Sequence, residues 1–244
     1  MRRETPSPAV DHAALDAQAA VRAALTRDFP GRVALVSSFG AESVVLLHMV
    51  AQVDRATPVL FCETGMLFPE TVGYQAEVAE LLGLRDVRRL RPDPADLASA
   101  DPDGALHAAD PDACCALRKV APLERALAGF DAWISGRRRS QSRTRAALAP
   151  VEADAAGRIK LNPLWGWSMD DMRAYVARHD LPPHPLAARG YPSIGCAPCT
   201  TPVRPGEDPR AGRWRGRAKE ECGIHIVGGR VSRTPGDAAP MDRV

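Results

Sequence analysis

Short apolar runs alternate with longer stretches of helical spacing through the first 180 residues. The runs predict buried strands at 32–38, 57–63, 86–92, 131–136 and 158–164. The spaced stretches predict helices at 12–29, 43–53, 69–83, 114–129 and 168–180. Strands that alternate with helices favour an α/β fold, a parallel sheet with helices on both faces. Ligands bind such sheets at the carboxyl ends of the strands.

The alternation stops near residue 180, where Pro, Gly and Arg become frequent. We expect disorder at 1–10 and 228–244, an α/β domain at 11–200, and a separate C-terminal segment at 201–227. No internal repeat is visible.

Composition narrows the class of protein. The chain has 244 residues, of which 45% are hydrophobic and 25% charged, as expected for one medium-sized globular domain. A net charge of +2 does not indicate a nucleic-acid polycation. The start shows no secretory signal, and no apolar run is long enough to span a membrane. We therefore expect a cytoplasmic protein without a membrane partner, in which clustered cysteines indicate metal binding or catalysis.

Four of the six cysteines form two pairs, Cys114–Cys115 and Cys196–Cys199. Zinc and a [4Fe–4S] cluster both accept four thiolates. Adjacent helix residues diverge by about 100°, which favours a cluster whose separate irons each take one thiolate. Lys119, one turn after Cys115, would offset the cluster's negative charge. The alternative is that Cys196 and Cys199 form a redox C-x-x-C pair, while Cys114 and Cys115 are small buried side chains. Cys62, within its predicted strand, is also expected to be a buried core residue.

Cys222 stands apart near the C-terminus and is a candidate nucleophile. Glu220 and Glu221 are expected to raise its pKa by like-charge repulsion. Activation would then come from Lys219, His225 or other cations. The alternative is an exposed thiol without a role.

Two strand–loop junctions could bind an anion. The stretch SSFGAES (37–43) joins a strand to a helix and carries hydroxyls and a glycine, although it is not a Walker loop. The stretch ISGRRRSQSRTR (134–145) is rich in arginine, and EDPRAGRWR (207–215) adds more. The alternatives are a solvated basic loop or nucleic-acid binding, but no aromatic residues interleave to stack bases. Guanidinium groups at strand ends suit a small, highly charged anion.

These motifs occur in a recognisable order. SSFGAESVVLLH, ETGMLFPET, CCALRK, ISGRRRSQSRTR, KLNPL, RGYPSIGCAPCT, GEDPRAGRW and KEECGIH follow one another between about residues 30 and 226. Together they resemble the assimilatory adenylyl-sulfate (APS) reductases of the phosphoadenylyl-sulfate reductase family.

The resemblance implies an adenine-nucleotide α-hydrolase-like fold, related to ATP pyrophosphatases. It implies reduction of APS to sulfite and AMP with thioredoxin as electron donor, through an S-sulfocysteine on Cys222, and with His225 of the same motif in a catalytic role. It also implies a [4Fe–4S] cluster bound by Cys114, Cys115, Cys196 and Cys199. The implied substrate-binding residues are Ser37, Ser38, Gly40, Glu63, Thr64, Gly65, Lys119, Gly136, Arg138, Gln141, Ser142, Arg210 and Arg213.

The chain departs from the family pattern at four positions. Glu63 stands where an Asp is usual, Arg137 replaces a Gln, and Arg215 and Gly216 replace aromatic residues. These departures leave open the contact geometry of Glu63 and the packing of the C-terminal segment.

In the family that the chain resembles, the presence of both cysteine pairs favours APS as substrate over its 3′-phosphorylated form (PAPS). The alternative is a reductase that uses PAPS or both substrates. A remoter alternative is a tRNA thiolation enzyme, but SSFGAES does not match the ATP-binding loop of those enzymes. Another is a Cys₄ nucleic-acid-binding module. We expect no nucleic-acid partner, and the sequence leaves the formation of a homo-oligomer open.

Overall fold

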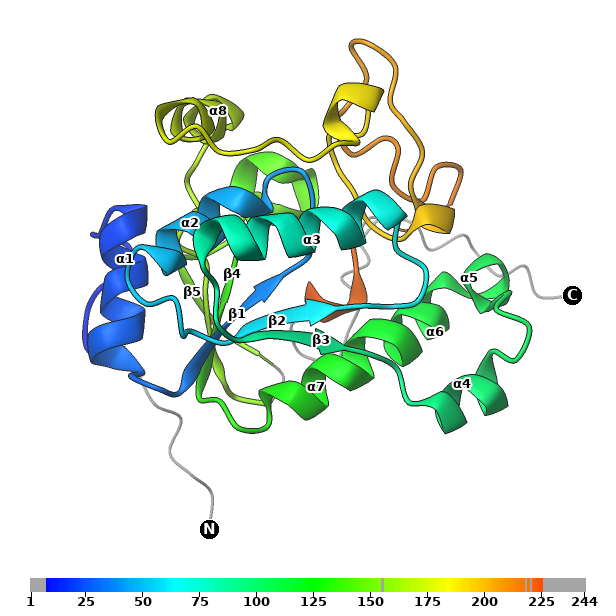
Figure 1. The fold of residues 1–244 in the computed structure, drawn as a ribbon, viewed down its shortest axis with the longest axis horizontal. Coiled ribbons are helices and arrows are strands. Elements are labelled where there is room, and N and C mark those ends of the chain that lie inside the picture. The colour runs from blue at the N-terminus through cyan, green and yellow to red at the C-terminus, as the bar shows by residue number, and fades with distance from the viewer. Residues whose placement is uncertain (1–7, 155, 218, 220, 226–244) are drawn as a thin grey trace, which may run out of the picture.

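A mostly parallel β-sheet organises the molecule (Figure 1). The computed structural model describes residues 8–154, 156–217, 219 and 221–225. Among these, six strands lie in the order β3-β2-β1-β4-β6-β5. The strands are β1 (Val33–Ser37), β2 (Val59–Cys62), β3 (Val87–Leu90), β4 (Ala132–Ser135), β5 (Val151–Ala153) and β6 (Ile159–Leu161). All neighbouring pairs are parallel except β5 with β6.

Helices connect the strands. The α-helices are α1 (Ala17–Ala23), α2 (Ser43–Ala51), α3 (Pro69–Leu82), α4 (Pro94–Ala100), α5 (Leu106–Ala109), α6 (Pro111–Cys115), α7 (Ala121–Leu127) and α8 (Met169–Arg178). Pro begins α3, α4 and α6 at a position where its missing N–H costs nothing. Gly83 ends α3 in the left-handed conformation.

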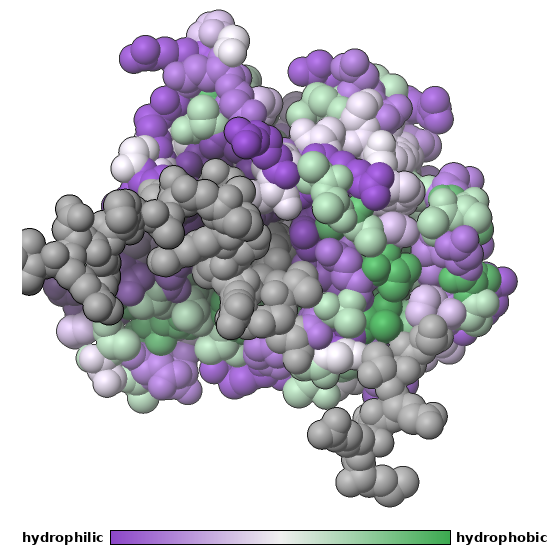
Figure 2. Space-filling view, turned by 180° about the vertical axis from the view of Figure 1, so that it is seen from behind, coloured by the Kyte–Doolittle hydropathy of each residue, from purple (hydrophilic) through white to green (hydrophobic). Residues whose placement is uncertain are grey.

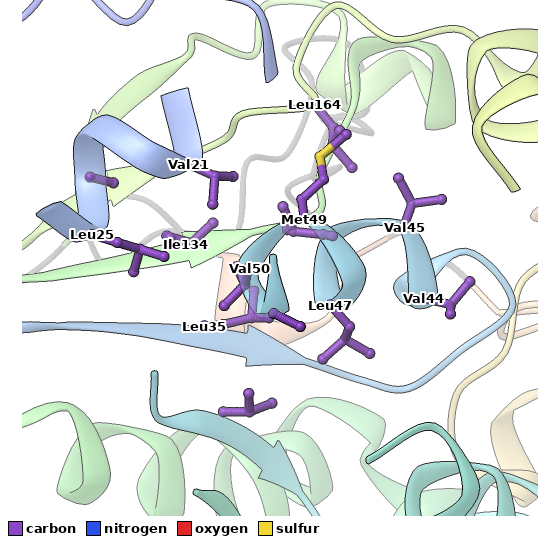
Figure 3. Close-up of a cluster of buried hydrophobic side chains, with 14 of the residues drawn as sticks. Val21, Leu25, Leu35, Val44, Val45, Leu47, Met49, Val50, Ile134 and Leu164 are labelled. Carbon is purple, nitrogen blue, oxygen red and sulfur yellow. The ribbon is translucent and has the colours of Figure 1, made fainter. Parts of the chain in front are cut away.

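The two faces of the sheet bury separate apolar clusters, because side chains alternate along each strand. Val33 and Leu35 of β1 face the larger cluster, formed with α1, α2 and α3. Figure 3 shows side chains of α2 in this cluster, among them Val45, Leu47 and Met49. Ala34 faces the smaller cluster, which contains Leu123 and Leu127 of α7. Helices therefore cover both faces, and the predicted fold class is confirmed.

The observed strands confirm the five predicted ones, each trimmed by a few residues. The predicted helix 114–129 is interrupted by a π-helical turn, Ala116–Val120, since Pro122 has no N–H to donate to the preceding turn. The predicted helix 12–29 begins only at Ala17 and also ends in a π-turn, Ala24–Asp28. Sequence analysis missed β5, α4 and α5. These short elements have few or no buried residues and therefore show no apolar period.

The strand order places a topological switch point beside β1. From β1 the chain proceeds to β2 and β3 on one side, and β4 then pairs on the other side. A crevice forms at such a point outside the carboxyl ends of the strands. The loops after β1 and β4 are the two loops in which the sequence predicts anion binding.

The described residues after α8 are irregular, and part of this segment packs against the connection between β2 and α3. Residues Leu67 and Cys196 form an isolated antiparallel bridge, as do Thr200 and Arg213. Figure 1 shows this segment beyond the carboxyl ends of the strands. The predicted disordered ends lie outside the described residues, apart from 8–10, which form neither helix nor strand.

The surface mixes polar and apolar side chains. In Figure 2, hydrophilic residues surround small separate groups of hydrophobic ones. Leu81 is the large hydrophobic residue left exposed among the described residues. Within the same part of the chain, no helix has the length and apolar character needed to cross a membrane.

Candidate active site

A cavity of about 200 Å³ occupies the switch point. Its walls come from the loops after β1 and β4, the irregular segment after α8, the connection between β2 and α3, and Lys119. The predicted site residues in its lining are Ser37, Ser38, Gly40, Lys119, Gly136, Gln141, Arg210, Arg213 and Cys222. The fold thus brings most of the predicted substrate contacts to one cavity.

The loop after β1 is held by its own hydroxyl groups. The backbone N–H of Phe39 donates to Ser37 Oγ at 3.2 Å, and that of Gly40 donates to Ser43 Oγ at 3.0 Å. Phe39 has φ of 47°, a conformation that non-glycine residues rarely adopt, and its ring is buried. The buried ring packs against Phe61 and stabilises this turn at the cavity wall.

The loop after β4 is tied to the N-terminus of α2. Glu42 accepts hydrogen bonds from Arg138 Nη2 at 2.6 Å and Gln141 Nε2 at 3.0 Å. Arg138 is 1% exposed and lies outside the cavity lining. The structure therefore places Arg138, a predicted substrate contact, behind the cavity lining, where it joins the two loops that the sequence predicts to bind an anion.

Arg145 and Arg137 also line the cavity, although the resemblance did not assign them. Arg145 is buried and donates two hydrogen bonds to Glu221. Arg137, which replaces a usual Gln, donates to Glu152 Oε2 of β5 at 2.9 Å. In the sequence, only the repeated arginines in 137–145 indicated that Arg137 and Arg145 could line a site. The number of arginines does not indicate which side chains point into the cavity.

A second, smaller cavity adjoins the first. All four paired cysteines line it, together with Arg118, Lys119, Arg213 and Trp214. Lys119 and Arg213 border both cavities. Burial raises the pKa of the Cys114 and Cys199 thiols, and Arg118 opposes this effect at Cys114. Two pairs of cysteines that lie about 80 residues apart in sequence therefore meet beside shared cations.

A glycine makes this meeting possible. Gly195 precedes Cys196, and a Cβ at this position would lie 2.3 Å from Arg213 Nη2. Any side chain at 195 would displace the guanidinium, whose Nη1 donates to the carbonyl of Ile194. Arg213 also stacks over Trp214, 4.5 Å from the ring centroid. The glycine of IGCAPC thus lets a cation approach the cysteine backbone.

The turn Glu63–Gly65 reaches the cysteines rather than the larger cavity. Thr64 is fully buried, and its Oγ1 lies 3.3 Å from Cys196 Sγ. Glu63 accepts from the N–H of Gly65 at 2.9 Å and pairs with Arg91 at 2.7 Å. The longer Glu63 side chain is therefore accommodated by a surface arginine.

Cys222 lies where both cavities approach each other. It lines the larger cavity and shares a hydrogen bond with Cys115, which lowers the pKa of the Cys222 thiol well below its usual value. Lys119 and Arg213 lower this pKa further. The net shift of the Cys222 pKa is therefore opposite to the one expected from Glu220 and Glu221, and the Glu221 carboxylate is itself paired with Arg145.

The remaining predicted residues have other positions. Lys219 pairs with Asp112 of α6, and Glu220 lies outside the described residues. Ser142 Oγ donates to Glu221 at 3.2 Å. His225 ends a 3-10 turn, Gly223–His225, and the catalytic role of its side chain stays a prediction.

The cysteine cavity can be tested for its fit to a cofactor. Within the described part of the chain, no three His, Cys, Asp or Glu side chains are placed to hold one metal ion. All six cysteines are free thiols, and four of them border one cavity with two neighbouring cations. A cubane spreads its ligands over four irons, so its sulfurs need not converge on one point. Four thiols beside two cations are thus a donor set that suits the predicted anionic iron–sulfur cluster.

Comparisons with known proteins agree with this geometry. The model of the phosphoadenosine phosphosulfate reductase domain matches residues 32–202. The adenosine 5′-phosphosulfate reductase of Mesorhizobium japonicum is 52% identical over 206 residues, which cover 84% of this chain and 81% of that protein. The phosphoadenosine 5′-phosphosulfate reductase of Gloeobacter violaceus is 44% identical, with coverage of 84% and 87%.

Solved structures show the same relationship. The phosphoadenylyl-sulfate reductase of Candida auris, a phosphate complex, has a TM-score of 0.67 and 29% identity, covering 78% of this chain and 92% of that chain. Yeast FAD synthetase, at a TM-score of 0.51 and 17% identity, aligns with 76% of this chain over 66% of its own length, and it shows a shared fold alone. With its motifs gathered at one switch point and its close relatives in one group, the chain belongs to the phosphoadenosine phosphosulfate reductase family.

Proposed function

We propose that this protein reduces adenylyl sulfate to sulfite and AMP in sulfate assimilation, with thioredoxin as the electron donor. The observation that carries the proposal is the position of Cys222. A thiol from the C-terminal segment enters a switch-point cavity lined by Lys119, Arg210 and Arg213. Relatives of 41–52% identity named adenosine 5′-phosphosulfate reductases support the choice of substrate.

The loops at the strand ends would bind the nucleotide. Ser37, Ser38 and Gly40 would face its phosphate, and Gly136 and Gln141 would line the other wall. Lys119, Arg210 and Arg213 would surround the sulfate. Because a thiolate must approach an anion, these cations would shield the repulsion and stabilise charge on the sulfate oxygens.

The chemistry needs two displacements. The Cys222 thiolate attacks the sulfate sulfur, the bridging S–O bond breaks, and AMP leaves with the bridging oxygen. The enzyme then carries an S-sulfocysteine. One thioredoxin thiolate attacks the Cys222 sulfur, sulfite leaves with the electron pair of the S–S bond, and the second thioredoxin thiol resolves the mixed disulfide. Both electrons therefore come from the thioredoxin dithiol.

Cys114, Cys115, Cys196 and Cys199 would hold a [4Fe–4S] cluster. When bound, the cluster would supply structure and local negative charge, which Lys119 and Arg213 would balance from the side of the substrate. Thr64 would support Cys196 through the contact between their side chains.

The test uses the full chain purified without oxygen. Sulfite release is measured with reduced thioredoxin and with either APS or PAPS. We expect turnover with APS. Failure with APS, or turnover with PAPS alone, would contradict the proposed substrate, whereas equal turnover with both would identify the dual-substrate alternative. Cys222→Ser should keep its iron yet form no sulfonated protein with APS, as measured by mass spectrometry.

A further inference from the structure

Glu221, the residue before Cys222, is bound by the arginine-rich loop. Its Oε1 accepts hydrogen bonds from Arg145 Nε at 2.7 Å, Thr144 Oγ1 at 3.0 Å and Ser142 Oγ at 3.2 Å. Its Oε2 accepts from Arg145 Nη2 at 2.6 Å and lies 3.8 Å from Arg210 Nη2. A two-point contact between carboxylate and guanidinium fixes direction as well as distance.

Arg145 is held for this contact. It belongs to the 3-10 turn Arg143–Arg145, its side chain is 7% exposed, and Nη1 donates to Gln141 Oε1. Gln141 is in turn bonded to Glu42 at the start of α2. The guanidinium is therefore oriented by the loop after β4 and, through Gln141, by Glu42 at the start of α2. Burial opposes ionisation of Glu221, but Arg145 and Arg210 bring the pKa of this carboxyl to about 2.

The same segment is also anchored on the opposite wall. Arg217 Nη1 donates to the carbonyl of His107 in α5 at 2.6 Å, and Lys219 pairs with Asp112 in α6. Beyond Cys222, Ile224 packs against the apolar cluster below the sheet. The described residues from Arg217 to Ile224 thus contact α5, α6 and the arginine-rich loop, and Cys222 lies in the cavity lining between these contacts.

This arrangement suits only one of the two proposed displacements. Cys222 is partly buried within the cavity, where it can meet a bound nucleotide. A protein donor is too large to enter a cavity of about 200 Å³, so the second displacement requires the segment to leave. An attachment of the segment must therefore form for the first displacement and break for the second.

We infer that Glu221 is the positioning residue that latches the nucleophile segment through Arg145. The inference rests on the proposed function. The latch holds Cys222 in the cavity during attack on the sulfate and releases it to the electron donor afterwards. The anchors at Arg217 and Lys219 lack the two-point geometry, and Asp112, the partner of Lys219, is largely exposed, so these anchors contribute less.

The test separates the two displacements in Glu221→Gln, which keeps the side-chain shape and removes the charge. A single turnover with APS and no reductant measures formation of the sulfonated protein, and we expect a loss of about tenfold or more, the usual range for a charge-assisted hydrogen bond. Release of sulfite from sulfonated protein, prepared by long incubation with APS and then mixed with reduced thioredoxin, should stay as fast as in the wild type or become faster.

Glu207→Gln is the matched control. It makes the same change in the same C-terminal segment, where Glu207 pairs with Arg215 away from the cavity. Both displacements should keep wild-type rates in this variant. Equal slowing of both displacements in Glu221→Gln, or no slowing of the first, would overturn the latch. Thr144→Val, which removes one hydrogen bond to Glu221, should show the same selectivity with a smaller loss, and it keeps the test valid if Glu221→Gln folds poorly.

A second readout does not depend on turnover. Trypsin should cleave after Arg217 or Lys219 faster in Glu221→Gln than in the wild type or Glu207→Gln, as followed by mass spectrometry of the full chain. If the wild type does not turn over APS but Glu221→Gln is cleaved faster, the proposed function is refuted, whereas the attachment of the segment through Glu221 is supported. Normal turnover with unchanged cleavage and unchanged sulfonation would refute the latch alone.

Discussion

The two adjoining cavities are built in different ways. One wall of the larger cavity consists of loops that directly follow β1 and β4, so each side chain lies close in sequence to the strand that positions it. The cysteine wall lines the smaller cavity and is assembled across the chain, from α6, the π-helical turn after it and the C-x-x-C loop at 196–199. The comparison teaches that a sheet can by itself position loops predicted to bind an anion, whereas the placement of the cysteines depends on contacts between distant parts of the chain.

Substitutions in the cysteine wall should affect the protein more than substitutions in the loops after β1 and β4. The largest effect is expected from loss of a thiolate that would bind the proposed cluster. Cys196→Ser should lose most of its iron and its turnover, because one of four thiolates is removed beside Thr64. Cys62→Ala provides the control for iron content, since Cys62 lies in β2 and outside the cysteine cavity. Iron analysis and visible absorption measure both variants. Full iron in Cys196→Ser, or equal loss in Cys62→Ala, would contradict the ligand assignment.

The next effect concerns the ion pair beneath the cysteine wall. Arg118 donates to the fully buried Asp101 through Nε and Nη2, and to the carbonyl of Thr64 through Nη1. Arg118→Met would leave Asp101 buried without its cation, which should lower the free energy of unfolding by about 3 kcal/mol. Chemical denaturation measures the change.

A surface pair supplies the control for this measurement. Arg173 and Asp170 of α8 form an ion pair with both side chains largely exposed. Arg173→Met should therefore change the free energy of unfolding by less than about 0.5 kcal/mol. Similar values for the two arginine variants would mean that the buried pair does not stabilise the cysteine wall.

A third, smaller effect is the pH dependence of the joint between α3 and the irregular segment. His184 is buried, lies 3.1 Å from Thr71 Oγ1 through Nε2, and accepts from the N–H of Leu186 through Nδ1. Burial lowers its pKa to about 4. Between pH 6.5 and 4 the unfolded chain binds the proton that the folded protein excludes. The free energy of unfolding should therefore decrease as the pH is lowered, by at most about 1.4 kcal/mol per pH unit.

His184→Asn tests this joint, because an amide can still accept from Leu186 but does not titrate. Urea denaturation of both proteins at pH 7, 6 and 5 gives the difference in unfolding free energy. The stability advantage of the wild type should shrink toward pH 5. A difference that stays constant with pH would show that His184 is not the group responsible.

The sequence by itself determined the alternation of strands and helices, and with it the sheet and the edge where ligands bind. Apolar period depends on near neighbours, so the five main strands could be read directly, while β5 could not, since it has no buried run of its own. The order of the motifs, read as a resemblance, also indicated the four paired cysteines and Cys222.

Only the tertiary structure decided which charged groups meet. It turned Arg138 toward Glu42, brought Arg213 over Gly195 and paired Glu221 with Arg145. It also placed Cys222 beside Cys115, Lys119 and Arg213, which lower the pKa of this thiol. Such pairs join residues tens of positions apart, and their partners depend on burial and side-chain direction. A local sequence pattern contains no information on burial or side-chain direction. For that reason the surroundings of Cys222 could be determined only from the folded chain.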